Sequence, residues 1–171
     1  MSCSRTTSAL MAGALAGLAG TATMMAMRMF DETYAPKTIP KTRRDPGRYM
    51  MRKAEAATNL PKVLPQGAVR RQIENAGAMS MQVGYGILPG IAYAMLRGQR
   101  RNGSSLVEGA AIGMGVYLLG YFGWLPLLGL TRPLWKQPLP EVVGETMRHV
   151  AYGVTTAAVY GALESVGSEA R

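Results

Sequence analysis

One helical face in the last third of the chain carries side chains that could do chemistry. Its polar residues follow at steps of four, three, four and four: Glu145, His149, Tyr152, Thr156 and Tyr160. Those steps place all five on the same face of an α-helix. A carboxylate and an imidazole at positions i and i+4 are near enough to hydrogen bond. A polar face of this kind is costly against lipid, so we expect it to point into the protein or toward a partner chain.

Three uses of this face stay open. Glu145 and His149 form a proton-responsive pair near the cytoplasmic interface, or both cap the helix and fasten it against the preceding turn. In a third interpretation, His149 is the sole cofactor ligand of a membrane enzyme. The chain has one His and one Cys, Cys3, which excludes an intramolecular disulfide and a structural zinc or bis-His haem within one chain. It shows no nucleophile with a base, no phosphate loop and no dinucleotide fingerprint, so we expect no enzyme activity, no metal and no cofactor.

The helices that must position this face are indicated by four windows without a formal charge, residues 8–27, 75–96, 109–131 and 149–163. A bilayer core of about 30 Å takes about 20 helical residues, so the first three windows are long enough to cross a membrane and the fourth needs its flanks. We therefore predict an all-α fold, a four-helix transmembrane bundle in a single integral membrane domain, residues 1–171. The predicted spans are about 8–30, 68–96, 106–130 and 141–165.

The first window also has features of a secretory signal peptide, because it follows a basic residue and has small residues near Thr21 and Ala22. Its apolar run is longer than the usual 7 to 15 or so residues, and it continues from Met24 to Phe30, past any suitable cleavage point. We expect a retained helix, with cleavage as the alternative.

Small residues recur at a spacing of four along the predicted spans. Such stripes let two helix backbones approach closely in a membrane, where lipid offers no hydrophobic drive for association. Alternatively, glycine is simply common in membrane helices. The predicted helix-packing residues are Gly13, Gly17, Gly86, Gly90, Gly109, Gly113, Gly153, Ala157 and Gly161. We expect them to meet the chain's own helices, a second copy in a homo-oligomer, or a larger membrane complex.

The net charge of +9 would suggest nucleic acid as the partner of a soluble protein. Here the Lys and Arg residues flank apolar windows, as in membrane proteins, so we expect no nucleic-acid partner. Most of them lie in a basic, Pro-rich loop, residues 31–67, and its flanks. If this loop is cytoplasmic, the inside segments hold 14 Lys and Arg and the outside segments 5. The positive-inside bias therefore places the loop in the cytoplasm and both termini on the opposite side.

The same loop is predicted to carry a short basic amphipathic helix, because Asp45 followed by Pro46 is a helix-start signature. Its apolar face holds Tyr49, Met50, Ala54 and Ala57. Such a helix lies on anionic lipid headgroups; a solvated helix or an irregular loop is the alternative. The predicted headgroup contacts are Arg43, Arg44, Arg48, Arg52 and Lys53, with Trp135 and Lys136 in the later turn. Aromatic residues gather toward the end of the third span, as at a membrane interface: Tyr117, Tyr121, Phe122 and Trp124.

A recognisable pattern covers residues 108–163. It consists of a glycine-bearing span and the turn after it, with Pro126, Gly129, Leu130, Thr131, Pro133, Pro138, Glu141, Glu145 and His149. In these positions the chain resembles the YagU-like family of small bacterial inner-membrane proteins, whose molecular function is largely undefined. A Gly usually precedes the His in that family, whereas Arg148 stands here. The resemblance implies an inner-membrane protein, sometimes linked to acid tolerance, and no catalytic residue.

These patterns favour a non-enzymatic integral membrane protein, a structural or accessory subunit that packs through Gly/Ala-rich helix faces. The alternative is a small proton-responsive or transport protein that uses Glu145 and His149.

Overall fold

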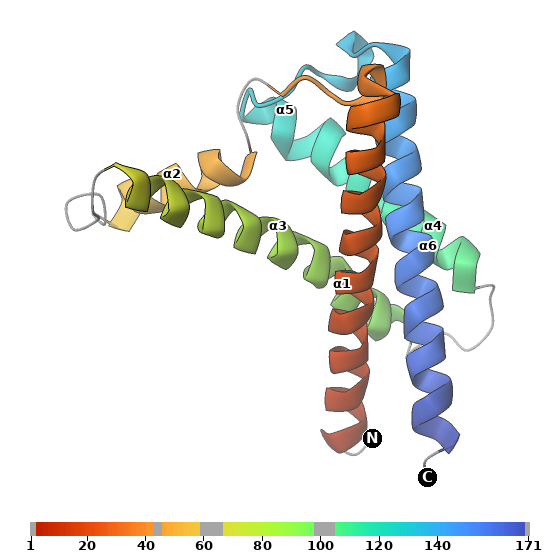
Figure 1. The fold of residues 1–171 in the computed structure, drawn as a ribbon. Helices are drawn as coiled ribbons and strands as arrows, with labels where there is room; N and C mark the ends of the chain where they lie inside the picture. Colours follow the sequence, from red (N-terminus) through yellow and green to blue (C-terminus); the bar gives the residue numbers. More distant parts are fainter. Residues whose placement is uncertain (1–2, 43–45, 59–66, 98–104, 170–171) are drawn as a thin grey trace.

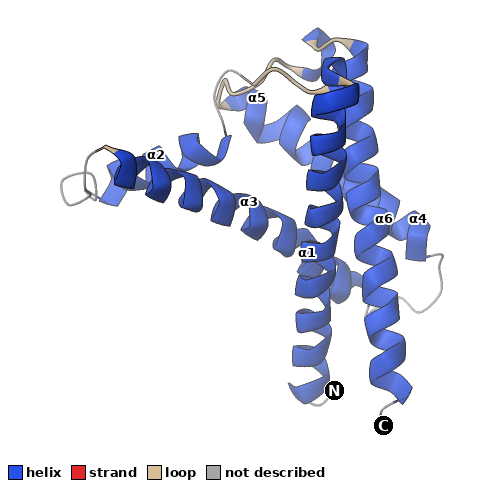
Figure 2. Cartoon of the chain, viewed as in Figure 1, coloured by secondary structure: helices blue, strands red, loops and turns tan. Residues whose placement is uncertain are grey.

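The computed structural model describes residues 3–42, 46–58, 67–97 and 105–169, and all regular structure in these ranges is helical (Figure 2). The predicted all-α class is confirmed. The longer helices are α1 (Cys3–Tyr34), α2 (Pro46–Thr58), α3 (Ala68–Arg97), α4 (Ser105–Leu118) and α6 (Leu139–Glu169). Shorter elements are the 3₁₀ turns η1 (Pro36–Thr38) and η4 (Leu134–Lys136), the π-helical segment η3 (Leu119–Trp124) and the single turn α5 (Leu125–Leu127).

Helices α1 and α6 run side by side in opposite directions, and both ends of the chain lie at the same end of this pair (Figure 1). Helix α4 packs along α6 and continues through η3 into α5. Gly129 ends α5 with a φ of +68°, a left-handed conformation that glycine adopts without strain. The N–H of Leu130 then bonds to the C=O of Leu125 at 2.9 Å, which is the hydrogen bond of a Schellman helix end.

Helix α3 contacts α1 through its C-terminal half, and its N-terminal half leads away from the α1–α6 pair (Figure 1). We call α2 together with residues 68–82 of α3 the arm. Within the arm, Gly47 lies against Ala78, and Gly77 lies against the side chain of Met51. The chain is therefore not a bundle of four aligned helices, because α3 crosses α1 and continues outward.

Two stretches of the described chain are long and apolar enough to cross a membrane, Thr6–Tyr34 and Leu106–Leu127. They match the first and third predicted spans. The predicted spans 68–96 and 141–165 are helical but do not meet this criterion, because glycines, tyrosines and polar residues such as Gln82 and His149 dilute their apolar content. The predicted four-helix transmembrane bundle is thus observed only as an all-α fold with two such helices.

Glycines bring the backbones of α1 and α3 into contact. A Cβ added at Gly13 would lie 2.7 Å from the carbonyl oxygen of Gly90, and one added at Gly17 would lie 2.7 Å from that of Gly86. Both separations are shorter than carbon and oxygen normally allow. Only glycine lets the two helices cross this closely.

Small residues also let α6 pack closely against its two neighbours, α1 and α4. A Cβ at Gly20 of α1 would lie 2.7 Å from the carbonyl oxygen of Tyr152, and one at Gly109 of α4 would lie 2.6 Å from the Cβ of Ala157. Gly113 and Gly153 pack at the same α4–α6 contact. A small buried core forms where α1, α3 and α6 meet: Ala16, Tyr93, Ala94, Ala157 and Tyr160.

Gly161 does not take part in this packing. It is exposed, and no described heavy atom lies within 4 Å of the place where its Cβ would stand. Gly161 therefore has no packing partner among the described residues, and its contact with a second copy or a larger complex stays a prediction.

Gly17→Ala should destabilise the fold, whereas Gly84→Ala, at a helical position with open space, should not. The new Cβ at Gly17 must push the backbone of α3 away at Gly86, and overpacking of this kind costs about 1–3 kcal/mol. Thermal unfolding in detergent, followed by far-UV circular dichroism, is expected to give a lower midpoint for Gly17→Ala only. Equal midpoints for the two variants would contradict the observed crossing.

Candidate functional site

Arg148 is the most deeply buried charged residue that the structure describes, with a side chain 1% exposed. Its guanidinium forms an ion pair with Asp31 of α1, and its Nη2 lies 3.2 Å from Oε1 of Glu145. Nη2 also donates a hydrogen bond of 2.8 Å to the carbonyl oxygen of Thr38. A buried cation is tolerated only when it is paired in this way. Arg148 thereby joins α6 to the end of α1 and to the segment that follows it.

Glu145 and His149 lie against each other one helical turn apart. His149 Nδ1 is 3.4 Å from Oε2 of Glu145 and 2.9 Å from the backbone carbonyl oxygen of Glu145. Both side chains are buried. The carboxylate of Glu145 is therefore shared between Arg148 and His149, a geometry that suits fastening of the helix as well as proton exchange.

Two tyrosines enclose the imidazole of His149. The ring of Tyr117 from α4 has its centroid 5.3 Å away, and the ring of Tyr121 from η3 stands edge-on at 6.0 Å. Tyr117 is 2% exposed, so its assignment to an interfacial aromatic cluster is wrong: it faces α6 inside the protein. Tyr121 lies in the π-helical turn, a distortion that is common at functional sites.

The remaining polar residues of the α6 face are buried against α1 and α3. Tyr152 donates its hydroxyl to the carbonyl oxygen of Gly86, which ties α6 to α3. Thr156 donates 2.8 Å to the carbonyl oxygen of Tyr152 on its own helix. Tyr160 meets the ring of Tyr93 edge-on, with centroids 5.4 Å apart. All five residues of the predicted polar face therefore point into the protein, as expected from the cost of facing lipid.

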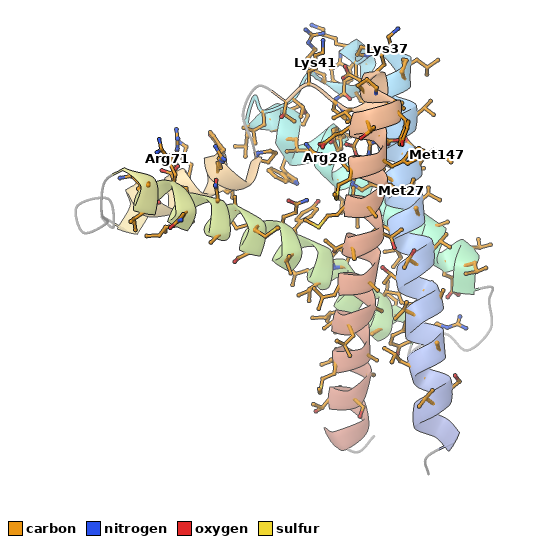
Figure 3. The ribbon with its side chains drawn as sticks, in the orientation of Figure 1. Met27, Arg28, Lys37, Lys41, Arg71 and Met147 are labelled. Atoms are coloured by element: carbon orange, nitrogen blue, oxygen red, sulfur yellow. The ribbon has the colours of Figure 1, made fainter. Side chains whose placement is uncertain are left out.

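A groove of about 810 Å³ opens between α1, the arm, η3 and α6, where α3 leads away from the α1–α6 pair. Its floor is polar and consists of Glu145, Arg148, His149 and Tyr152. Its walls are largely apolar and rich in methionine: Met24, Met25, Met50, Met79, Met81, Val116, Trp124 and Leu125. Arg28 of α1 and Arg48 of α2 stand at its exposed edge, and Figure 3 shows Arg28 on the side of α1 that faces the arm.

Two polar atoms at the floor of this groove lack a hydrogen-bond partner among the described residues. They are Oε2 of Glu145 and Nε of Arg148, and both are buried. Buried polar atoms in proteins nearly always have a partner. Oε2 of Glu145 still lies 3.4 Å from Nδ1 of His149, and neither unpaired atom is accessible from the groove.

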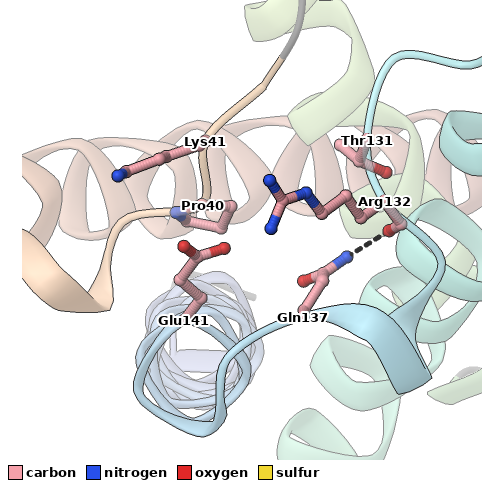
Figure 4. A pocket seen from close by; sticks show the side chains of 6 residues that line it. All are labelled: Pro40, Lys41, Thr131, Arg132, Gln137 and Glu141. Carbon is pink, nitrogen blue, oxygen red and sulfur yellow. Dashed lines mark hydrogen bonds between the residues drawn. The ribbon is translucent and has the colours of Figure 1, made fainter.

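The turn before α6 forms a second and much smaller pocket (Figure 4). Its volume is about 10 Å³. A cavity of that size holds about one water molecule. Gln137 closes the turn by donating a 2.6 Å hydrogen bond to the carbonyl oxygen of Arg132. The lining residues are Pro40, Lys41, Thr131, Arg132, Gln137 and Glu141. The pocket holds the turn together and is too small for a ligand.

The predicted amphipathic helix is present as α2, and the contact of its apolar face with lipid stays a prediction. Glu55 is the buried residue and pairs with Arg70 of α3 at 3.0 Å, whereas Met50 and Ala54 are exposed. Arg70 also holds Glu74 at 3.1 Å. Ion pairs between α2 and α3 determine how α2 lies, so its apolar residues remain on the outside of the arm.

The predicted headgroup residues on described segments are all exposed: Arg48, Arg52, Lys53, Trp135 and Lys136. Arg43 and Arg44 lie outside the described residues. Lys37, Lys41 and Arg71 lie toward the end of the molecule opposite the termini (Figure 3). Their exposure is what a headgroup contact requires, and the contact itself stays a prediction.

Across the described ranges, no three side chains of His, Cys, Asp or Glu are close enough together to hold a metal ion. Comparisons with protein-family models, with curated proteins and with solved structures find no match. The resemblance to the YagU-like family stays a prediction, and the site is interpreted from its own geometry.

The two residues that hold this site together, Asp31 and Arg148, are not among those predicted from the sequence. A signal was present, because a charge at the edge of a predicted span requires an opposite charge at the same depth. Arg148 also stands three residues after Glu145, a spacing that brings two helical side chains together.

Replacing Arg148 with Met should destabilise the protein by about 3–5 kcal/mol, because it leaves the carboxylates of Asp31 and Glu145 without their buried partner. Arg28→Gln is the matched control, since Arg28 forms an exposed pair with Glu32, and such pairs contribute about 0–1 kcal/mol. Unfolding by heat or denaturant in detergent measures both changes.

The double variant Asp31→Asn, Arg148→Met isolates the pair. Its loss of stability should be smaller than the sum of the two single losses, because the second substitution removes a partner that is already gone. Additive losses would show that Asp31 and Arg148 do not interact.

Proposed function

We propose that this chain is a non-enzymatic integral membrane protein whose apolar helix faces lie against lipid. The exposure of its two most apolar helices carries the proposal. Only 28% of the apolar window in Thr6–Tyr34 and 22% of that in Leu106–Leu127 is buried, whereas the core helix of a soluble protein is mostly buried. The large exposed side chains on these stretches include Met11, Leu15, Leu18, Leu118, Leu119, Phe122 and Leu127. A contiguous apolar surface of this kind is solvated by lipid or by a protein partner.

The proposed location is a bacterial inner membrane, crossed more than once, with the 31–67 loop in the cytoplasm. The two ends of the chain lie together at one end of the molecule, which suits termini on the same side of a membrane (Figure 1). Lys37, Lys41 and Arg71 lie toward the opposite end (Figure 3), as the positive-inside bias requires of the cytoplasmic side. The inner membrane as the specific location rests on the resemblance alone.

Within that membrane we assign the chain the role of a structural or accessory subunit. The glycine stripes meet the chain's own helices, so a second copy or a larger complex would contact other surfaces. Exposed apolar side chains that do not line the groove are available for such a contact, among them Met11 and Leu15 of α1 and Met95 and Leu96 of α3. No arrangement of a nucleophile with a base supports an enzymatic role for the groove.

Alkaline carbonate should leave the intact chain in the membrane pellet. In a Cys3→Ser background, an impermeant maleimide added to spheroplasts should label Ser165→Cys and should label Lys41→Cys only after lysis. Recovery of the chain in the carbonate supernatant would refute the membrane proposal. Reversed labelling would refute the orientation alone.

The accessory role has a separate readout. Extraction in mild detergent should bring down a second copy or a larger complex in fixed stoichiometry. A monodisperse monomer without any co-purifying protein would contradict the accessory role and leave the membrane proposal in place.

A small proton-responsive or transport protein is the second candidate, because Glu145 and His149, 3.4 Å apart, both line the groove. On this hypothesis His149→Ala abolishes a pH-dependent flux in proteoliposomes while circular dichroism shows an intact fold. Gln82→Ala is the matched control, since Gln82 also lines the groove but does not titrate. Absence of flux in the unmodified protein, or equal flux in both variants, would remove this candidate.

A further inference from the structure

We infer that the groove binds one anionic phospholipid of the bilayer, with the acyl chains between α1 and the arm and the acidic headgroup at Arg28 and Arg48. The inference rests on the proposed membrane location and adds a specific partner to it. Three independent features support it: the depth of the groove, the chemistry of its walls and the charge at its edge.

The groove runs from the middle of the membrane toward its cytoplasmic surface. On α1 it is lined from Thr21, next to the midpoint of Thr6–Tyr34, to Arg28. On the α4–η3 helix it is lined from Val116, at the midpoint of Leu106–Leu127, to Leu125. Thr21 and Arg28 are separated by a helical rise of about 10 Å, and one leaflet contributes half of a core about 30 Å thick. The groove therefore extends over about two thirds of the apolar part of one leaflet.

Acyl chains suit the walls at this depth. Among the described lining residues, the walls carry five methionines, Met24, Met25, Met50, Met79 and Met81, together with Trp124 and Leu125. Methionine side chains are flexible and adapt to irregular apolar partners. A volume of about 810 Å³ falls in the range of about 300–1,000 Å³ that is usual for ligand sites. Water would leave these walls poorly solvated, and lipid chains are the molecules available at this depth.

The charge of the groove selects an acidic headgroup. Arg28 and Arg48 stand at its edge, whereas the charge of Arg148 at its floor is balanced by Asp31 and Glu145. Arg28 lies at headgroup depth and forms an exposed ion pair with Glu32. Exposed pairs are weak, so a phosphate can also bind the guanidinium of Arg28. Guanidinium groups match phosphate geometry, so the edge favours a lipid with net negative charge over a zwitterionic one.

Phosphatidylglycerol is an anionic phospholipid and serves as the probe of this site.

Trp124 provides the test because it lines the groove and Trp135→Phe leaves it as the single Trp of the chain. This variant is placed in phosphatidylcholine vesicles that contain a minor fraction of either brominated phosphatidylglycerol or brominated phosphatidylcholine. Bromine on the acyl chains quenches a tryptophan that it contacts. We expect about a thirtyfold preference of the site for the anionic lipid, because each of the two basic residues near the headgroup contributes about 1 kcal/mol.

Two sets of variants separate the groove from the general lipid surface. Gly84→Phe fills the groove at a position with open space, and Gly161→Phe adds the same ring at an open position away from it. The first should reduce quenching by phosphatidylglycerol severalfold, and the second should leave it unchanged. Arg28→Gln with Arg48→Gln should remove the preference for the anionic lipid.

Equal quenching by the two lipids, or equal quenching in Gly84→Phe and Gly161→Phe, would overturn the lipid site. Flotation of the vesicles on a density gradient keeps this result apart from a failure of the membrane proposal. Protein that does not float with the vesicles refutes the membrane location, whereas protein that floats without a lipid preference refutes the bound lipid alone.

Discussion

Direct contact between helix backbones at glycine is the interaction on which the rest of this structure depends. Gly13 and Gly17 of α1 meet Gly90 and Gly86 of α3 at distances that leave no room for a Cβ. In the proposed membrane, lipid tails give helices no hydrophobic reason to associate, and close van der Waals packing at small residues holds them together. Because this contact uses the C-terminal half of α3, the N-terminal half leads outward and the groove opens beside it.

A second constraint is the buried guanidinium of Arg148, which lies between Asp31 and Glu145. Taking an ion pair out of water gains little net stability, but removing one partner is strongly unfavourable. The arrangement therefore orients the end of α1 against α6 more than it strengthens the fold. It also places Glu145 and His149 at the floor of the groove, so the same cation that joins two helices gives an apolar groove its polar base.

The helices and the inward polar face of α6 are predictable from the sequence, because both depend on local periodicity and on the absence of charge within each window. The course of α3 and the pair Asp31–Arg148 depend on contacts between segments far apart in the chain, and no local pattern specifies them. Gly161 shows the same limit, since its spacing repeats that of Gly153 and Ala157 but no described residue packs against it. The position of α2 on α3 depends on the ion pair from Glu55 to Arg70, which the apolar periodicity of α2 alone does not reveal.

We propose that lipid, and not water, covers the exposed apolar faces of α1 and α4. Nitroxide labels on cysteines that replace Leu15, Leu18 and Leu118 report this directly, since all three side chains are exposed. In reconstituted protein the labels should collide more often with oxygen, which is concentrated in lipid, than with a water-soluble nickel complex. A label at the buried Ala16 should collide little with either. Preferential collision of the three exposed labels with the nickel complex would contradict the account.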